Sequence, residues 1–175
     1  MPVHGTDGIH AKFDASLNKL IVYWGESKCH KTLSSGLKDA LESISEFVKG
    51  GHEKREIDIV SDHLDLGDYG AEAQNAILKY LDPYSQESNE RITVFSCLLV
   101  FNAPKLKSDF DDPDEVEKDF VKRINKSAEK FIESIKKSTE DFGLGTKRFE
   151  FFLVPVPSVQ QFRDDFQSRI GWPND

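Results

Sequence analysis

The sequence predicts an α/β domain in which helices flank a mixed β-sheet. Two long apolar, β-branched runs, "RITVFSCLLVF" at 91–101 and "RFEFFLVPVP" at 148–157, are typical of strands. Other stretches repeat apolar residues every three or four positions, as amphipathic helices do. The two kinds of segment alternate, which favours a sheet covered by helices. At 175 residues the chain fits a single domain over 1–175.

A hairpin is predicted at the front of the chain. The segments "IHAKFD" at 9–14 and "KLIVYWGESK" at 19–28 are strand-like, and the turn residues "DASLN" join them. Antiparallel pairing around this turn is expected to place residues 5–9 opposite residues 24–28.

Helices are predicted after the hairpin. Leucine, isoleucine and valine recur at helical spacing through 33–48, and the glycines at 50–51 are expected to end that helix. Its candidate capping residues are Thr32, Ser34 and Ser35. A second helix is predicted over 70–81. The segment "REIDIVSDHLDL" fits either a strand or a short helix.

The second half of the chain carries the two apolar runs. Their continuous apolarity favours interior strands covered on both faces. A long helix is predicted between them, at about 113–140, with its apolar residues on one stripe. A closing helix is predicted after Ser158, whose hydroxyl is expected to cap it.

Charge and cysteine content limit the classes of function. The net charge of −8 disfavours nucleic acid as a partner of the whole surface. The first 54 residues, however, hold seven lysines and seven acidic residues, so a phosphate-binding surface there remains open. No apolar run is long enough to span a bilayer, and no signal peptide opens the chain. Cys29 and Cys97 lie in apolar contexts, which predicts two reduced thiols and a cytoplasmic protein without membrane contact.

The stretch "YWGESKCHK" places charge on an otherwise apolar strand. Because alternate strand residues share a face, Glu26 and Lys28 continue the row that begins with Leu20, Val22 and Trp24. One interpretation is a simple ion pair where the strand emerges into water. The other is a functional cluster, because a charge at such a place is costly unless it is paired or binds a cation.

A second acidic residue favours the cluster. Asp7 lies between glycines in "HGTDGIH", and the predicted hairpin brings it to the same end as Glu26 and Lys28. Two carboxylates flanked by main-chain oxygens suit a hard cation such as Mg²⁺, with Mn²⁺ as a substitute. A neighbouring lysine can orient a water molecule or neutralise charge that builds on a phosphate.

These residues resemble a known family. Asp7 followed by "ESK" at 26–28 is similar to the Asp…Glu-x-Lys signature of the restriction-endonuclease-like, PD-(D/E)xK nucleases. Five sequence segments resemble the HamA family, the nuclease subunits of the Hachiman anti-phage defence system. These segments are "MPVHGTDGIHA", "YWGESK", "EIDIVSDHLDL", "YLDPYS" and "FEFFLVPVPSV". The resemblance covers most of the chain.

The resemblance implies a metal-dependent DNA nuclease that works with a helicase partner, HamB. It assigns metal binding to Asp7, Glu26 and the main-chain oxygen of Ser27, and catalysis to Asp7, Glu26 and Lys28. Members of the family extend further upstream, so the resemblance also implies a short form. The alternative is therefore a catalytically weak module of the same fold that mainly docks on the helicase.

Three further residues are candidates for substrate binding. His10 lies close to Asp7 on the first strand and can serve as a base or a phosphate ligand. Lys31 and Ser34 stand at the start of the first long helix, where main-chain N–H groups attract anions such as a DNA phosphate. Ordinary surface and capping roles for these three residues remain open.

Overall fold

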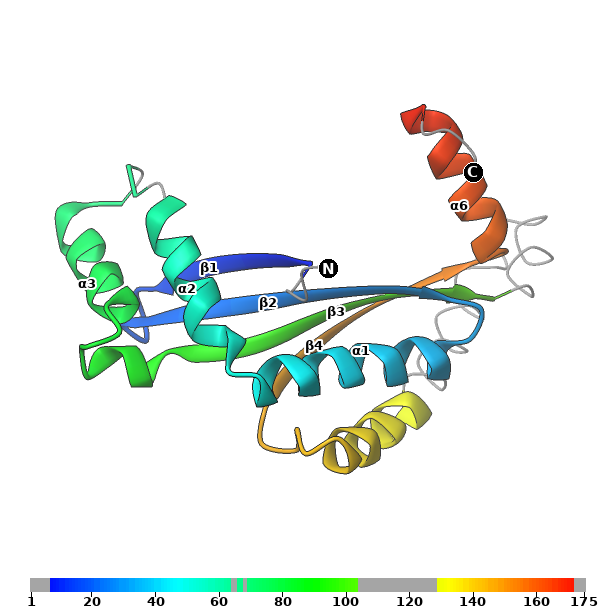
Figure 1. The fold of residues 1–175 in the computed structure, drawn as a ribbon, viewed down its shortest axis with the longest axis horizontal. Helices are drawn as coiled ribbons and strands as arrows, with labels where there is room; N and C mark the ends of the chain where they lie inside the picture. Colours follow the sequence, from blue (N-terminus) through cyan, green and yellow to red (C-terminus); the bar gives the residue numbers. More distant parts are fainter. Residues whose placement is uncertain (1–6, 64–65, 68, 104–128, 172–175) are drawn as a thin grey trace. The chain divides into compact units, whose positions relative to one another are not determined.

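The computed structural model describes residues 7–63, 66–67, 69–103 and 129–171. Its strands form one sheet in the order of the chain, with the first two strands antiparallel (Figure 1). They are β1 (Gly8–Asp14), β2 (Lys19–His30), β3 (Ile92–Asn102) and β4 (Arg148–Val156). The helices are α1 (Leu33–Lys49), α2 (His52–His63), α3 (Ala71–Leu81), the short 3₁₀ helix η1 (Glu87–Glu90), α6 (Val159–Ile170) and a helix at 129–141. The predicted class, a mixed sheet flanked by helices, is confirmed.

The chain divides into two compact units, which are described separately. The first unit holds residues 1–26, 43–97 and 146–150. The second holds residues 27–42, 98–145 and 151–175. The assignment of the whole chain to a single domain stays a prediction.

The β1–β2 hairpin has the predicted register. Asp14 pairs with Lys19 and Gly8 pairs with Gly25, as expected for a turn over 15–18. The Asp14 carboxylate accepts hydrogen bonds from the main-chain N–H groups of Ser16 and Leu17, at 2.9 and 3.1 Å. These bonds close the turn and lower the pKa of Asp14 below its ordinary value, the hydroxyl of Ser16 contributing most.

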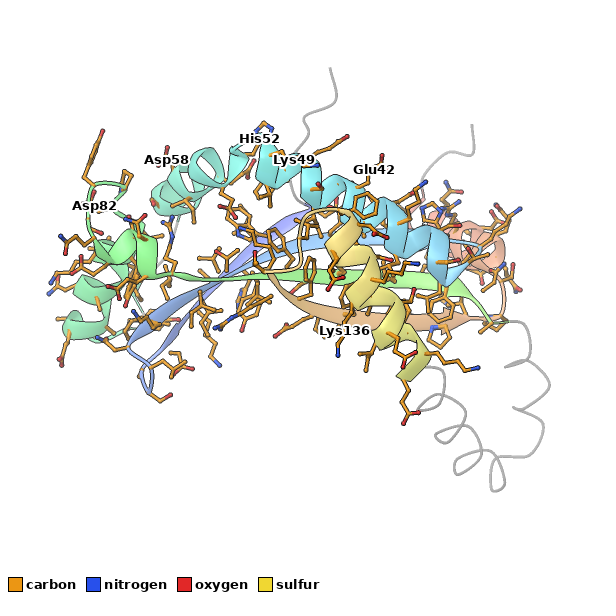
Figure 2. The ribbon with its side chains drawn as sticks, turned by 90° about the horizontal axis from the view of Figure 1, so that it is seen from below. Glu42, Lys49, His52, Asp58, Asp82 and Lys136 are labelled. Carbon is orange, nitrogen blue, oxygen red and sulfur yellow. The ribbon has the colours of Figure 1, made fainter. Side chains whose placement is uncertain are left out.

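Helix α1 begins and ends where the sequence predicts. The Thr32 hydroxyl accepts a hydrogen bond from the Ser35 N–H at 3.2 Å, so Thr32 is the residue that caps the helix. Gly51, with φ of 66°, follows the last turn, a conformation that favours glycine. The ambiguous segment after it is helical and forms α2. Figure 2 shows Lys49 and His52 on either side of the junction between α1 and α2.

Aromatic rings build the core of the first unit. Trp24 of β2 packs against Phe47 of α1 with ring centroids 5.0 Å apart, and Phe95 of β3 packs against Phe149 of β4 at 5.6 Å. Helices α2 and α3 lie near the closed end of the hairpin (Figure 1). There the Tyr80 hydroxyl donates a 2.6 Å hydrogen bond to the carbonyl oxygen of Asn18, which ties α3 to the β1–β2 turn.

In the second unit, the helix at 129–141 packs against the sheet. Phe131 of this helix, which carries Lys136 in Figure 2, makes an edge-to-face contact with Phe151 of β4 at 6.0 Å. The closing helix α6 is capped as predicted, because the Ser158 hydroxyl accepts the Gln161 N–H. The N–H of Val159 also donates to the Asn102 side chain at 2.6 Å.

The second half of the chain departs from the predicted burial of β4, and the predicted helix before it is described only in part. The prediction that both apolar runs are covered on both faces is wrong for β4, which lies at the edge of the sheet and leaves Phe152 at 55% exposure. Its apolar residues therefore face both the core and the solvent-accessible side. The predicted helix at 113–140 is helical over 129–140, and its earlier part lies outside the described residues.

Candidate functional site

Glu26 is a buried carboxylate at the end of a hydrophobic row. Along β2, Leu20, Val22 and Trp24 are exposed by only 1–2%, and Glu26 continues this inward face at 6%. The predicted placement of Glu26 on the apolar face is confirmed. Both interpretations of Glu26, the ion pair and the functional cluster, stay predictions. Burial makes the charge of this carboxylate costly, so its position calls for a functional or structural reason.

Cys97 is a buried neighbour of Glu26. It lies on β3, the strand beside β2, with 0% exposure. Burial, together with the negative charge of Glu26, raises the pKa of the Cys97 thiol to about 12. The thiol therefore stays protonated at neutral pH and does not compete with the carboxylate for a cation.

Asp7 is held beside Glu26 through its main chain. Its N–H donates a hydrogen bond to the carbonyl oxygen of Gly25 at 3.0 Å. The chain bends at Asp7, directly before β1 begins, and its side chain is exposed. The expected approach of the Asp7 backbone to the Glu26 end of the hairpin is confirmed. The backbone of an exposed acid, directly before β1, thus adjoins the end of β2 that carries a buried acid.

The other two residues of the signature follow Glu26 on β2. Ser27 is exposed, and Lys28 is half-buried. The placement of Lys28 on the face that Glu26 occupies stays a prediction from strand alternation. Their part in metal binding and catalysis remains a prediction from the family resemblance.

His10 lies on the opposite face of the hairpin from Glu26. It is exposed and pairs with Tyr23, and the two rings are tilted by 41° with their centroids 6.0 Å apart. Tyr23 is half-buried. His10 therefore stands where an approaching molecule can reach its ring.

The remaining candidates lie in the second unit, at the start of α1. Lys31 and Ser34 are both exposed. The Ser34 hydroxyl lies 3.4 Å from that of Thr32, and the Lys31 carbonyl oxygen accepts the Asn102 N–H at 3.4 Å. Thr32 performs the capping, so both side chains are available to solvent. Their predicted role as phosphate ligands stays a prediction.

The ligands that the sequence assigns to a metal ion, Asp7, Glu26 and the main-chain oxygen of Ser27, stay a prediction. The candidate donors are two carboxylates and a main-chain carbonyl oxygen, which is the ligand type that Mg²⁺ and Mn²⁺ prefer. In the described part of the chain, no group of three or more His, Cys, Asp and Glu side chains is placed to hold a metal ion. A site at Glu26 therefore depends on Asp7 and on main-chain oxygen.

One residue near the candidate site, Cys97, escapes sequence reasoning. The proximity of Cys97 to Glu26 depends on the pairing of β2 with β3, and no local pattern predicts which strands become neighbours. The outward placement of Tyr23, by contrast, follows from the sequence, because strand alternation assigns it to the face opposite Trp24.

Comparison with known proteins identifies one relationship. The family model described as HamA matches residues 1–170. No curated protein and no solved structure matches the chain. Among the helices of the described residues, none is long and apolar enough to cross a bilayer.

Proposed function

The chain belongs to the HamA family, and on that premise we propose that it is a metal-dependent DNA nuclease that acts with a helicase partner. Membership of the family supports a role in Hachiman anti-phage defence. The proposed reaction is the hydrolysis of a phosphodiester bond. The observation that carries the proposal is the burial of Glu26, at 6% exposure, with the main chain of Asp7 bonded to the residue before it.

The proposed roles follow from the chemistry of each group. Asp7, Glu26 and the main-chain oxygen of Ser27 would hold Mg²⁺ or Mn²⁺. A bound divalent ion supplies Lewis-acid stabilisation of charge on phosphate oxygens. Lys28, which strand alternation assigns to the same face of β2 as Glu26, would orient the attacking water through its ammonium group and offset negative charge in the transition state. Burial strengthens these electrostatic interactions because the local dielectric is low.

A plasmid-cleavage assay tests the proposal. The purified chain, with its helicase partner, is incubated with plasmid DNA and Mg²⁺ or Mn²⁺. We expect Glu26→Gln and Lys28→Ala each to reduce cleavage by at least about a hundredfold. Matched controls are Glu42→Gln and Lys49→Ala, which change the same residue types at exposed positions on α1 (Figure 2). Cleavage by Glu26→Gln at the parent rate would overturn the assignment.

A second candidate function is a docking module for the helicase. Three large apolar side chains of α6, spaced four residues apart, are exposed by 43–56%: Phe162, Phe166 and Ile170. Residues at this spacing share one helix face. They line a hollow of about 470 Å³ together with Cys29 and Arg163. An apolar stripe of this kind favours a protein partner over DNA.

Co-purification separates the two candidates. If the chain serves mainly to dock, Phe166→Ser will release the helicase subunit, and Glu26→Gln will leave defence against phage intact. The control Ile132→Ser removes an equally exposed apolar residue from the helix at 129–141. Loss of defence in Glu26→Gln with full retention of the helicase would favour the nuclease over the module.

A further inference from the structure

The β1–β2 hairpin presents a second face that the proposed catalytic residues do not use. Trp24 and Val22 point into the core, so Tyr23 and its neighbours at alternate positions point the other way. Opposed residues of an antiparallel pair share a face. Four opposed pairs therefore lie in a row on this outer face: Gly8 with Gly25, His10 with Tyr23, Lys12 with Ile21, and Asp14 with Lys19.

The second pair of this row, His10 with Tyr23, is aromatic and open to solvent. The rings of His10 and Tyr23 have centroids 6.0 Å apart and planes tilted by 41°. His10 is exposed and Tyr23 half-buried. A tilted pair of this kind leaves ring surface free, and the flat face of a nucleobase stacks on exposed aromatic rings.

The pair on one side of the aromatic rings has no side chains. A Cβ atom on Gly8 would meet nothing within 4 Å, whereas one on Gly25 would lie 3.2 Å from the Gly8 carbonyl oxygen. Gly25 is thus required for the close approach of the two strands, but Gly8 is not. Because Gly8 and Gly25 lack side chains, only main-chain atoms of this pair face outward between His10 and Asp7.

The pair on the other side adds positive charge. Lys12 is exposed on the same face as His10. Successive residues on one face of a strand are about 7 Å apart, so the ammonium group and the rings lie within reach of one nucleotide. Positive charge beside aromatic side chains is the combination that single-strand-binding proteins use.

We propose that His10 and Tyr23 form a stacking platform for unpaired nucleotides, with Lys12 as its phosphate contact and the glycine pair as the path towards Asp7. The preferred substrate is then a single strand or a frayed duplex end, because the faces of paired bases are hidden within the duplex. This inference rests on the proposed nuclease function, since it names the substrate of that site.

The test measures binding without cleavage. The full-length chain is titrated into a fluorescent single-stranded oligonucleotide in EDTA, and anisotropy reports the dissociation constant. We expect the oligonucleotide to bind about tenfold more tightly than an abasic one of the same length, and than its duplex. Tyr23→Ala and Gly8→Val are expected to abolish this preference. Tyr23→Phe should retain it, as should the control Tyr84→Ala, which removes a tyrosine that is 93% exposed elsewhere in the same unit.

Each outcome decides the proposal. Equal affinity for intact, abasic and duplex DNA overturns the platform, as does an unchanged preference in Tyr23→Ala. If Tyr23→Ala does not fold, His10→Ala takes its place, because His10 is exposed. The platform fails independently of the nuclease assignment, since cleavage by the parent chain and its loss in Glu26→Gln are measured with metal and scored separately.

Discussion

The N–H of Asp7 donates a 3.0 Å hydrogen bond to the carbonyl oxygen of Gly25, the residue that directly precedes Glu26. This bond continues the contact between β1 and β2 past the last paired residues of the ladder, Gly8 and Gly25. It fixes the backbone of an exposed acid next to that of a buried acid. The consequences for metal binding, thiol chemistry and stability can each be measured.

Replacing Asp7 is expected to weaken metal binding. Asp7→Asn keeps the shape of the side chain but removes its charge, so the dissociation constant for Mn²⁺, measured by calorimetry, should rise about tenfold or more. Glu72→Gln serves as the control, because Glu72 is an exposed acid on α3 in the same unit. Equal affinities of Asp7→Asn and the parent would exclude Asp7 as a ligand.

The two cysteines should differ in reactivity. Thiolate is the reactive form of cysteine, and burial together with the charge of Glu26 raises the pKa of Cys97 to about 12. Cys29 is only partly buried. We expect one fast thiol per native chain in an Ellman titration, and both in urea. Cys29→Ser should remove the fast reaction. Rapid modification of Cys97 in native Cys29→Ser would contradict the structure.

The hairpin turn should show a pH-dependent stability. Hydrogen bonds from Ser16 and Leu17 lower the pKa of Asp14 in the folded chain below 3.8, so the unfolded chain binds its proton more readily. The stabilisation is therefore complete above pH 3.8 and is lost as the pH falls through the lower, folded pKa. Asp14→Asn should be less stable than the parent at pH 7, with the difference shrinking in acid. Urea unfolding across pH measures it, and a constant difference would refute the charge effect.

Gly8 and Gly25 should respond differently to the same substitution. Gly25→Ala places a methyl group 3.2 Å from the Gly8 carbonyl oxygen, and main-chain atoms move only with the hairpin. We expect it to cost about 1–3 kcal/mol in the free energy of unfolding. Gly8→Ala meets no atom within 4 Å and should change stability by less than about 0.5 kcal/mol. Denaturant titrations of the pair test this, and equal effects would show that the close approach is absent.

Local features of the fold were predictable from the sequence. The residues that form the β1–β2 turn set its register, and strand alternation then placed Glu26 on the buried face. Helix α1 was predictable because its cap at Thr32, its apolar period and its terminal glycines agree. The segment that forms α2 was ambiguous because its few apolar positions fit both the helical period and the strand period.

Non-local features were not predictable in the same way. The apolar run of β4 predicts an interior strand, but β4 lies at the edge of the sheet. Its position depends on which strands pair, and a local pattern does not determine that. For the same reason the sequence gives no sign that Cys97 borders Glu26. Of the candidate site, the backbone approach of Asp7 could be deduced from the hairpin, and the residue types suggested a cation site. The assignment of a DNA nuclease came from the family resemblance.

The pairing of β2 with β3 also has a consequence for the order of folding. The β1–β2 hairpin makes contacts that are local in the chain, and such contacts form early. Glu26 is buried beside Cys97 of β3, which follows only after α1, α2 and α3 have been synthesised. Its carboxylate is therefore expected to keep its hydration shell on the nascent chain. The desolvation of Glu26 becomes a late event, and the proposed nuclease site matures only when the third strand has docked.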